Sequence, residues 1–254
     1  MSNRPERANP HRVLIVGATS AMAAATGRLY AAKGAKLYLT GRNRDKLTAT
    51  AADLRVRGAA EVETVVLDLL ETARHAAVID DAFQKLGGLD VALVAHGVLP
   101  EQARCEADAA AAREAINVNF SSTVALLTLL ANRFEEQGRG CIAVISSVAG
   151  DRGRQSNYVY GATKGGLNVF LQGLRNRLFR PGVTVLTLKP GFVDTPMTAH
   201  LPKNALFASP AAAGKAIYRA IEAGRDVAYI PAFWRLILLV VKSIPESIFK
   251  RLRF

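Results

Sequence analysis

The sequence predicts a single α/β domain in which a doubly wound parallel sheet carries helices on both faces. Short apolar runs rich in branched residues alternate with longer helical stretches along all 254 residues. Half of the residues are hydrophobic, which is enough for one large core, and no repeat or linker divides the chain. In such a sheet the ligand is expected beyond the carboxyl ends of the strands.

The expected strands are short apolar runs, most of which end in glycine, serine or a charged residue: 12–17, 36–41, 61–68, 90–97, 140–147, 183–189 and 226–230. Helices are expected between them, with one or two in the fourth interval: 18–33, 43–57, 72–86, 107–137, 157–179 and 209–223. Asn43 and Ser209 stand where helix N-caps are favoured, and Pro210 stands at a first-turn position.

The two ends of the chain differ from its middle. Residues 1–11 are polar and lack the apolar segment of a signal peptide, so a disordered lead is expected there. Residues 12–231 are expected to form the domain, and residues 232–254 an apolar and basic helical tail. No run reaches eighteen apolar residues, so we expect no membrane-spanning helix and a cytoplasmic location.

Charge and cysteine content bound the partners. The net charge of +12 would suit nucleic acid, a membrane surface or a phosphorylated ligand, and a soluble basic enzyme can also carry it. There is no zinc-finger spacing and no aromatic RNA-binding motif, so a nucleic-acid partner is not expected. Cys105 and Cys141 lack a metal-site spacing and are typical of thiols in a reducing compartment. No metal site is expected.

The chemistry is expected between Ser147 and Lys164. Tyr160 and Lys164 are spaced i, i+4, so a helix places both on one face. A free tyrosine has a pKa of about 10, and a nearby ammonium is expected to lower it so that the phenol can pass a proton. Ser147 ends a strand and could orient a carbonyl or carbinol oxygen. The alternative is an amphipathic helix with one tyrosine and one solvated lysine.

A proton-transfer site of this kind needs a hydride donor, and the first strand–helix turn predicts where it binds. Gly17 ends the strand, and Thr19, Ser20, Ala21 and Met22 lead into the helix, where exposed N–H groups can hold a pyrophosphate. An ordinary strand–helix turn is the alternative.

The end of the second strand indicates which dinucleotide binds. It carries no acid for a ribose 2′-hydroxyl, and Arg42 can meet a 2′-phosphate instead, which predicts NADPH over NADH. The alternative is that Arg42 and Arg44 are only solvated. Asp68, with Leu69, is assigned to the cofactor site and could accept from the adenine amine. His96 and Gly97 are expected along the ribose, with His96 as wall rather than base.

These motifs resemble the short-chain dehydrogenase/reductase family over nearly the whole chain. The family's Tyr-x-x-x-Lys matches Tyr160 to Lys164 and its serine matches Ser147. Its proton-relay asparagine matches Asn119, with Asn117 as the alternative, and its Pro-Gly turn beside the nicotinamide matches Pro190 and Gly191, followed by Val193 and Thr195.

The resemblance implies a Rossmann-like NADP-dependent ketone reductase. It implies that Tyr160 protonates the oxygen, that Lys164 lowers the phenol's pKa and holds the nicotinamide ribose, and that Ser147 positions the carbonyl. Two family motifs depart: alanines stand at 21 and 23 where glycines are usual, and Asn-Ala-Gly is replaced by Ala95-His96-Gly97.

The tail is unusual for an ordinary reductase. Phe233 and Trp234 precede an apolar run and a break at Pro245, and basic side chains outnumber the acid Glu246: Arg235, Lys242, Lys250, Arg251 and Arg253. This pattern suits a helix lying in the headgroup region of an anionic bilayer, on the inner face of the cell membrane. The alternative is a helix that covers the core or a second subunit, and a homo-oligomer is also expected.

The tail and the 197–201 loop resemble those family members that reduce decaprenylphosphoryl-2-keto-erythro-pentose to the arabinose form. This resemblance implies a polyprenyl-phosphate-linked sugar as substrate and a partner oxidase that supplies the ketone. The alternatives are a reductase of another hydrophobic carbonyl, such as a lipid or polyketide ketone, and a catalytically silent binding or scaffold protein.

Overall fold

The computed structural model describes residues 11–199 and 201–252. The expected disordered lead lies almost wholly outside these residues, as do the last two residues of the tail. The strands are β1 Arg12–Val16, β2 Lys36–Gly41, β3 Glu61–Val66, β4 Val91–Val94, β5 Gly140–Ile145, β6 Val183–Pro190 and β7 Val227–Ile230. All pair in parallel in one sheet of order β3-β2-β1-β4-β5-β6-β7, which confirms the predicted fold class.

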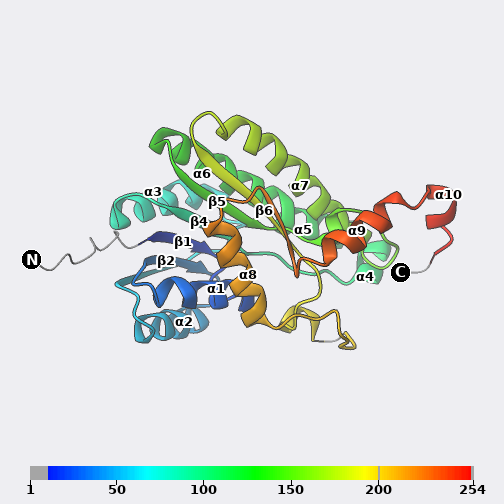
Figure 1. The fold of residues 1–254 in the computed structure, drawn as a ribbon, viewed down its shortest axis with the longest axis horizontal. Coiled ribbons are helices and arrows are strands. Elements are labelled where there is room, and N and C mark those ends of the chain that lie inside the picture. Colours follow the sequence, from blue (N-terminus) through cyan, green and yellow to red (C-terminus); the bar gives the residue numbers. More distant parts are fainter. Residues whose placement is uncertain (1–10, 200, 253–254) are drawn as a thin grey trace, which may run out of the picture.

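Helices cover both faces of the sheet (Figure 1). On one face lie α1 Ala21–Ala31, α2 Arg44–Val56 and α8 Pro210–Glu222, and on the other lie α3 His75–Leu86, α6 Ser122–Gln137 and α7 Tyr158–Leu178. Each layer has its own apolar core: Tyr30, Leu47 and Ile217 belong to the first, and Phe134 and Leu171 to the second. Sequence capping signals are realised, since Asn43 accepts from the Lys46 N–H at 2.8 Å and Ser209 from the Ala212 N–H at 3.1 Å.

The strand register places the expected site residues at one edge. Val16 pairs with Thr40 of β2 on one side and with Val94 of β4 on the other. The strand order reverses between β1 and β4, so their carboxyl ends diverge into helices on opposite faces and leave a crevice. The fourth strand is shorter than expected because residues 95–97 leave the sheet and run along this crevice.

The interval expected to hold one or two helices is more divided. It contains α4 Gln102–Ala107, α5 Ala109–Ile116, the π-helical turn Asn117–Ser121 and then α6. In the π turn the Ser122 N–H bonds to the Asn117 carbonyl, five residues back. The continuous helical stretch Ala109–Gln137 is, by length and composition alone, long and apolar enough to cross a membrane, and 44% of its most apolar window is buried in the fold. Leu126, Leu130 and Phe134 belong to the core beneath the sheet, as in a core helix.

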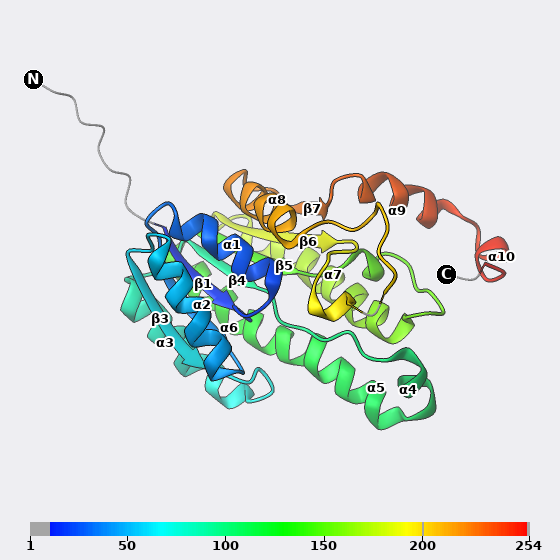
Figure 2. The same ribbon diagram turned by 90° about the horizontal axis from the view of Figure 1, so that it is seen from below.

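The tail forms α9 Trp234–Ser243 and α10 Glu246–Phe249, separated at Pro245, and it extends from one end of the molecule (Figures 1 and 2). Arg152, five residues after Ser147, holds its end. The guanidinium donates to the carbonyls of Ile244 at 2.8 Å, Lys242 at 3.1 Å and Val241 at 3.3 Å, and to the Glu246 carboxylate at 2.8 Å. These contacts satisfy carbonyls that the end of a helix leaves without partners.

Candidate active site

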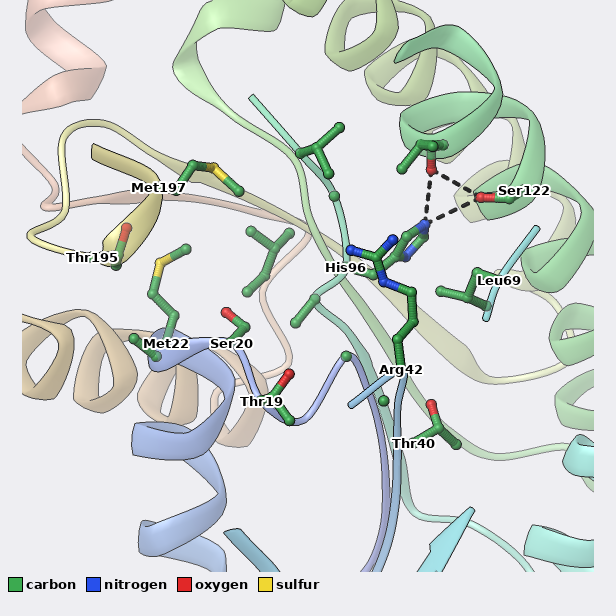
Figure 3. Close-up of a pocket in the computed structure, with 18 of the residues that line it drawn as sticks. Thr19, Ser20, Met22, Thr40, Arg42, Leu69, His96, Ser122, Thr195 and Met197 are labelled. Carbon is green, nitrogen blue, oxygen red and sulfur yellow. Dashed lines mark hydrogen bonds between the residues drawn. The ribbon is translucent and has the colours of Figure 1, made fainter. Parts of the chain in front are cut away.

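A cavity of about 420 Å³ lies at the carboxyl edge of the sheet, between β1, β2 and β4 and the start of α7 (Figure 3). Most of the residues assigned from sequence line it: Gly17, Thr19, Ser20, Ala21, Met22, Arg42, Asp68, Leu69, His96, Gly97, Tyr160, Lys164, Pro190 and Thr195. Residues that sequence reasoning missed also line it, among them Asn43, Lys46, Val118, Ser122 and Met197. Lys46 could have been predicted from the sequence, because it follows Arg42 by four residues at the start of the next helix, α2 Arg44–Val56.

The turn from β1 into α1 depends on Gly17. Its φ of 78° lies in the left-handed region, and a Cβ on Gly17 would stand 2.9 Å from the backbone nitrogen of His96. Ala21 and Ala23 replace the family's glycines without backbone strain, because both lie in the regular helix α1 and no described residue other than glycine has a positive φ. The turn therefore keeps the N-terminus of α1 open to the cavity.

The cavity wall near β2 is cationic. Arg42 and Lys46 both line it, and Arg42 extends along the cavity toward His96 (Figure 3). Asp68, which follows β3, also lines the cavity, and its carboxylate accepts from the Leu70 N–H at 3.0 Å. The donors at the α1 terminus and these cations fit a dinucleotide phosphate.

His96 is a wall residue, as expected. Its Nε2 lies 3.3 Å from Ser122 Oγ (Figure 3). The same nitrogen lies 3.0 Å from the Val118 carbonyl and 3.2 Å from Thr123 Oγ1. Burial, with the Lys164 charge, lowers the pKa of His96 to about 4, so the imidazole is neutral at pH 7. The remaining Nδ1 is buried without a partner. The ring thus ties the β4 loop to the π turn.

Tyr160 and Lys164 meet at the cavity floor. The Lys164 ammonium lies 5.8 Å from the centre of the Tyr160 ring and donates to the Ile145 carbonyl at 3.1 Å. Burial lowers the Lys164 pKa to about 8. Burial also raises the pKa of Tyr160, and a hydrogen bond with Ser147 offsets this only in part. The expectation of a lowered phenol pKa is therefore wrong, because desolvation outweighs the stabilising contacts.

Ser147 and Asn119 lie just behind the cavity surface. Ser147 is buried, and its Oγ accepts from the Ala149 N–H at 3.1 Å in addition to bonding with Tyr160. Asn119 is fully buried in the π turn, with its amide paired to both backbone groups of Val98, at 2.8 Å and 2.9 Å. The alternative Asn117 is exposed. Asn119 therefore holds the loop that carries Gly97.

Two residues assigned to the cofactor lie away from the cavity surface. Val193 is buried in the core. Gly191 faces the tail instead, because a Cβ on it would stand 2.0 Å from Trp234 Nε1. Sequence reasoning placed both on the cavity side of the turn, whereas the indole covers the other side.

A buried ionic cluster packs against the segment between Ser147 and Tyr160. Nothing in the sequence pattern indicated this cluster. The Lys189 ammonium bonds to Asp151 at 2.5 Å, and the Tyr229 hydroxyl donates to the same carboxylate at 2.7 Å. Asn168 links Asp151 to Ser146 Oγ, with bonds of 3.4 Å and 2.7 Å. The cluster thereby joins β6 and β7 to the segment between Ser147 and Tyr160.

A Rossmann-like sheet with this site defines a dinucleotide-dependent oxidoreductase. The sequence profile of the short chain dehydrogenase family matches residues 11–206. The chain is 37% identical over 240 residues to an uncharacterized oxidoreductase of Mycobacterium tuberculosis, covering 94% of this chain and 96% of the relative. It is 34% identical over 244 residues to an uncharacterized oxidoreductase of Streptomyces coelicolor, with 96% of each covered.

The fold is also similar to that of levodione reductase, with a TM-score of 0.81 and 23% identity over 89% of this chain and 98% of that one. The chain belongs to the short-chain dehydrogenase/reductase family. It is an NAD(P)(H)-dependent oxidoreductase that acts on a carbinol or a carbonyl group.

Proposed function

We propose that the protein is an NADPH-dependent reductase of a ketone carried on a polyprenyl phosphate, a 2-keto-pentose that is converted to the arabinose form. The observation that carries the proposal is the position of Tyr160 beside Lys164, in the same cavity as the N-terminus of α1 and Arg42. A phenol there can give its proton to the alkoxide that forms when a carbonyl is reduced.

In the proposed reaction the dinucleotide supplies the hydride, and residues of this chain handle the oxygen. Ser147 would donate to the substrate carbonyl and orient it beside the Tyr160 hydroxyl, with which it already bonds. Tyr160 would then protonate the oxygen. Lys164 would stabilise the phenolate that remains and hold the nicotinamide ribose. Asn119, with a water, would return a proton from solvent to the phenolate.

NADPH is favoured over NADH by the charge at the end of β2. Arg42 and Lys46 line the cavity there, and no carboxylate stands at the position where a ribose 2′-hydroxyl would be bound. A guanidinium–phosphate contact is worth about 1.5–3 kcal/mol. Pro190 and Thr195 would border the nicotinamide, since both line the cavity near Tyr160.

The lipid-linked substrate and a peripheral membrane contact are supported by the tail. Leu236, Leu239 and Val240 of α9 are exposed by 64–68%, beside the basic residues of the chain end. Such a helix can rest at the inner face of the cell membrane, where a polyprenyl phosphate is available. A partner oxidase and a homo-oligomer stay predictions, to be checked by co-purification and by sedimentation.

The test is NADPH oxidation with a polyprenyl-phosphate 2-keto-pentose, compared with a panel of lipid and polyketide ketones and with a control lacking substrate. Turnover of the ketosugar well above the panel supports the proposal. Faster turnover of a lipid ketone would favour the alternative hydrophobic carbonyl. NADPH binding without turnover of any compound would favour a silent binding protein.

A further inference from the structure

A second cavity, of about 480 Å³, lies where the tail meets the loop before α7. Its lining residues come from the 153–158 segment and from the chain end: Gly153, Arg154, Gln155, Tyr158, Glu246, Phe249, Lys250 and Leu252. It shares no lining residue with the catalytic cavity. The proposed reaction does not use it, and of its lining residues only Glu246 bonds to Arg152, which holds the tail.

This cavity carries positive charge that the described residues do not balance. Glu246 is the acid in its lining, and that carboxylate is paired with Arg152 at 2.8 Å. Across residues 11–199 and 201–252, no hydrogen bond or ion pair reaches the Arg154 guanidinium, although burial already disfavours its charge and lowers its pKa. Lys250 adds a second cation on the opposite wall. A partly buried arginine without a counter-ion favours an anionic ligand.

Exposed apolar side chains occur along the tail that forms one part of this cavity's lining. Ile248 and Leu252 of the chain end are exposed, and so are Leu236 and Val240 of α9 and Phe233 just before it. Leu236 and Val240 are four residues apart, so they lie on one side of the helix, while Trp234 and Leu238 are buried on the other. Apolar side chains next to a cationic pocket match the boundary between acyl chains and headgroups.

We propose that this cavity binds the phosphate of an anionic membrane phospholipid. Arg154 is its main cation, Lys250 the second, and the Tyr158 hydroxyl and the Gln155 amide are available as further donors. The inference rests on the proposed membrane contact of α9 and α10 and adds a headgroup preference to it. A bilayer lipid is favoured over the substrate's own phosphate because the phosphate-bearing carbon of the proposed substrate is bonded to the ketone carbon. The substrate's phosphate must therefore stay beside Tyr160.

The test is vesicle flotation with Arg154→Gln, using phosphatidylcholine vesicles with and without phosphatidylglycerol. Arg180→Gln is the matched control, because it removes the same charge just beyond the opposite end of α7. We expect Arg154→Gln to weaken binding to the phosphatidylglycerol vesicles about fivefold, from about 1 kcal/mol per basic residue at the surface. Binding to the neutral vesicles and the melting temperature should be unchanged. An equal loss of binding with Arg180→Gln would show that only the net charge matters, and it would refute the proposed phosphate site.

A second variant separates the pocket from the membrane contact on which it rests. Leu236→Gln combined with Val240→Gln changes only exposed side chains and should reduce binding to both kinds of vesicle. If this variant floats like the wild type, the membrane contact itself is refuted. If it loses binding while Arg154→Gln binds normally, only the headgroup site is refuted. A raised KM of Arg154→Gln for a short-chain prenyl-phosphate ketosugar in vesicle-free solution would place the substrate's phosphate in the cavity and overturn the phospholipid assignment.

Discussion

The indole of Trp234 occupies the space that a side chain at position 191 would need. A Cβ on Gly191 would stand 2.0 Å from Trp234 Nε1, and the indole packs edge-on against Phe192, which in turn stacks on Phe207. The first residue of α9 is thus attached to the Pro190–Gly191 turn beside the cavity. The tail is part of the packing around the active site as well as an appendage to the fold.

Trp234→Ala should lower the free energy of unfolding by about 3–5 kcal/mol, the usual cost of removing a buried tryptophan. Urea denaturation measures it, with the more exposed neighbour Phe233→Ala as the control. Gly191→Ala alone should also destabilise the protein because it collides with the indole. In the Trp234→Ala background that cost should largely disappear, since the added methyl enters vacated space. Additive effects would contradict the contact.

Tyr160→Phe should lower kcat by about 10²- to 10⁴-fold, the range for losing a general acid, and leave the Kd for NADPH unchanged. Stopped-flow turnover and cofactor fluorescence measure the two quantities. Tyr218→Phe on α8, which does not line the cavity, is the matched control and should keep wild-type kcat. Turnover that survives in Tyr160→Phe would remove the proposed acid.

Arg42→Gln should lower kcat/KM for NADPH by about 10- to 150-fold, corresponding to a contact of about 1.5–3 kcal/mol, and leave that for NADH unchanged. Arg44→Gln is the control because Arg44 does not line the cavity. The ratio of the two specificity constants is the decisive readout. A parallel loss with both cofactors would mean that Arg42 does not meet a 2′-phosphate.

Stability should fall in mild acid because of His96. The unfolded chain protonates this imidazole near its ordinary pKa of about 6.5, whereas the folded protein does so only near a pKa of about 4. Between these values the unfolded state binds more protons, so the free energy of unfolding decreases as the pH falls from 6.5 to 4.

The measurement is urea denaturation across that pH range for the wild type and for His96→Gln, which keeps a donor for the Val118 carbonyl. The variant should lose less stability than the wild type. The difference is the readout, because burial lowers the pKa of His75 as well and that effect is common to both proteins. Identical slopes would show that His96 does not titrate between the two states.

Lys189→Met should destabilise the fold by about 3–5 kcal/mol, since it leaves the buried Asp151 carboxylate without its cation. Lys203→Met removes a lysine from the exposed pair with Asp194 and should cost less than about 1 kcal/mol. Chemical denaturation of both variants compares them directly. Equal effects would mean that the Asp151 carboxylate is already compensated by Tyr229 and Asn168.

The parallel sheet could be predicted because buried strands of such sheets are short, continuous apolar runs, and their carboxyl ends share one edge. That geometry alone brought Gly17, Arg42 and His96 together. The Tyr160–Lys164 pair was readable because its spacing fixes a common helix face. What lay within a few residues in sequence was therefore accessible to pattern reasoning.

The contacts that sequence reasoning missed join distant segments. Arg152 bonds to carbonyls about ninety residues later, and Asp151 meets Lys189 and Tyr229 from two other strands. The Tyr160 pKa was wrongly predicted for a related reason. Spacing reveals the charged neighbour of a group, but the extent of its desolvation depends on everything packed around it.

The π turn at Asn117–Ser121 has a consequence for comparing this chain with other sequences. A π turn holds one residue more than the regular helix would need, and that surplus rotates Asn119 relative to the residues of α5. Deleting a single residue there would restore an ordinary helix, yet it would swing every side chain of α5 by roughly 100° about the axis relative to α6. An alignment that places a gap at this extra residue therefore matches residues that lie on different faces of the helix. A variant with one residue deleted here would gain a regular helix but would turn Asn119 away from its present direction.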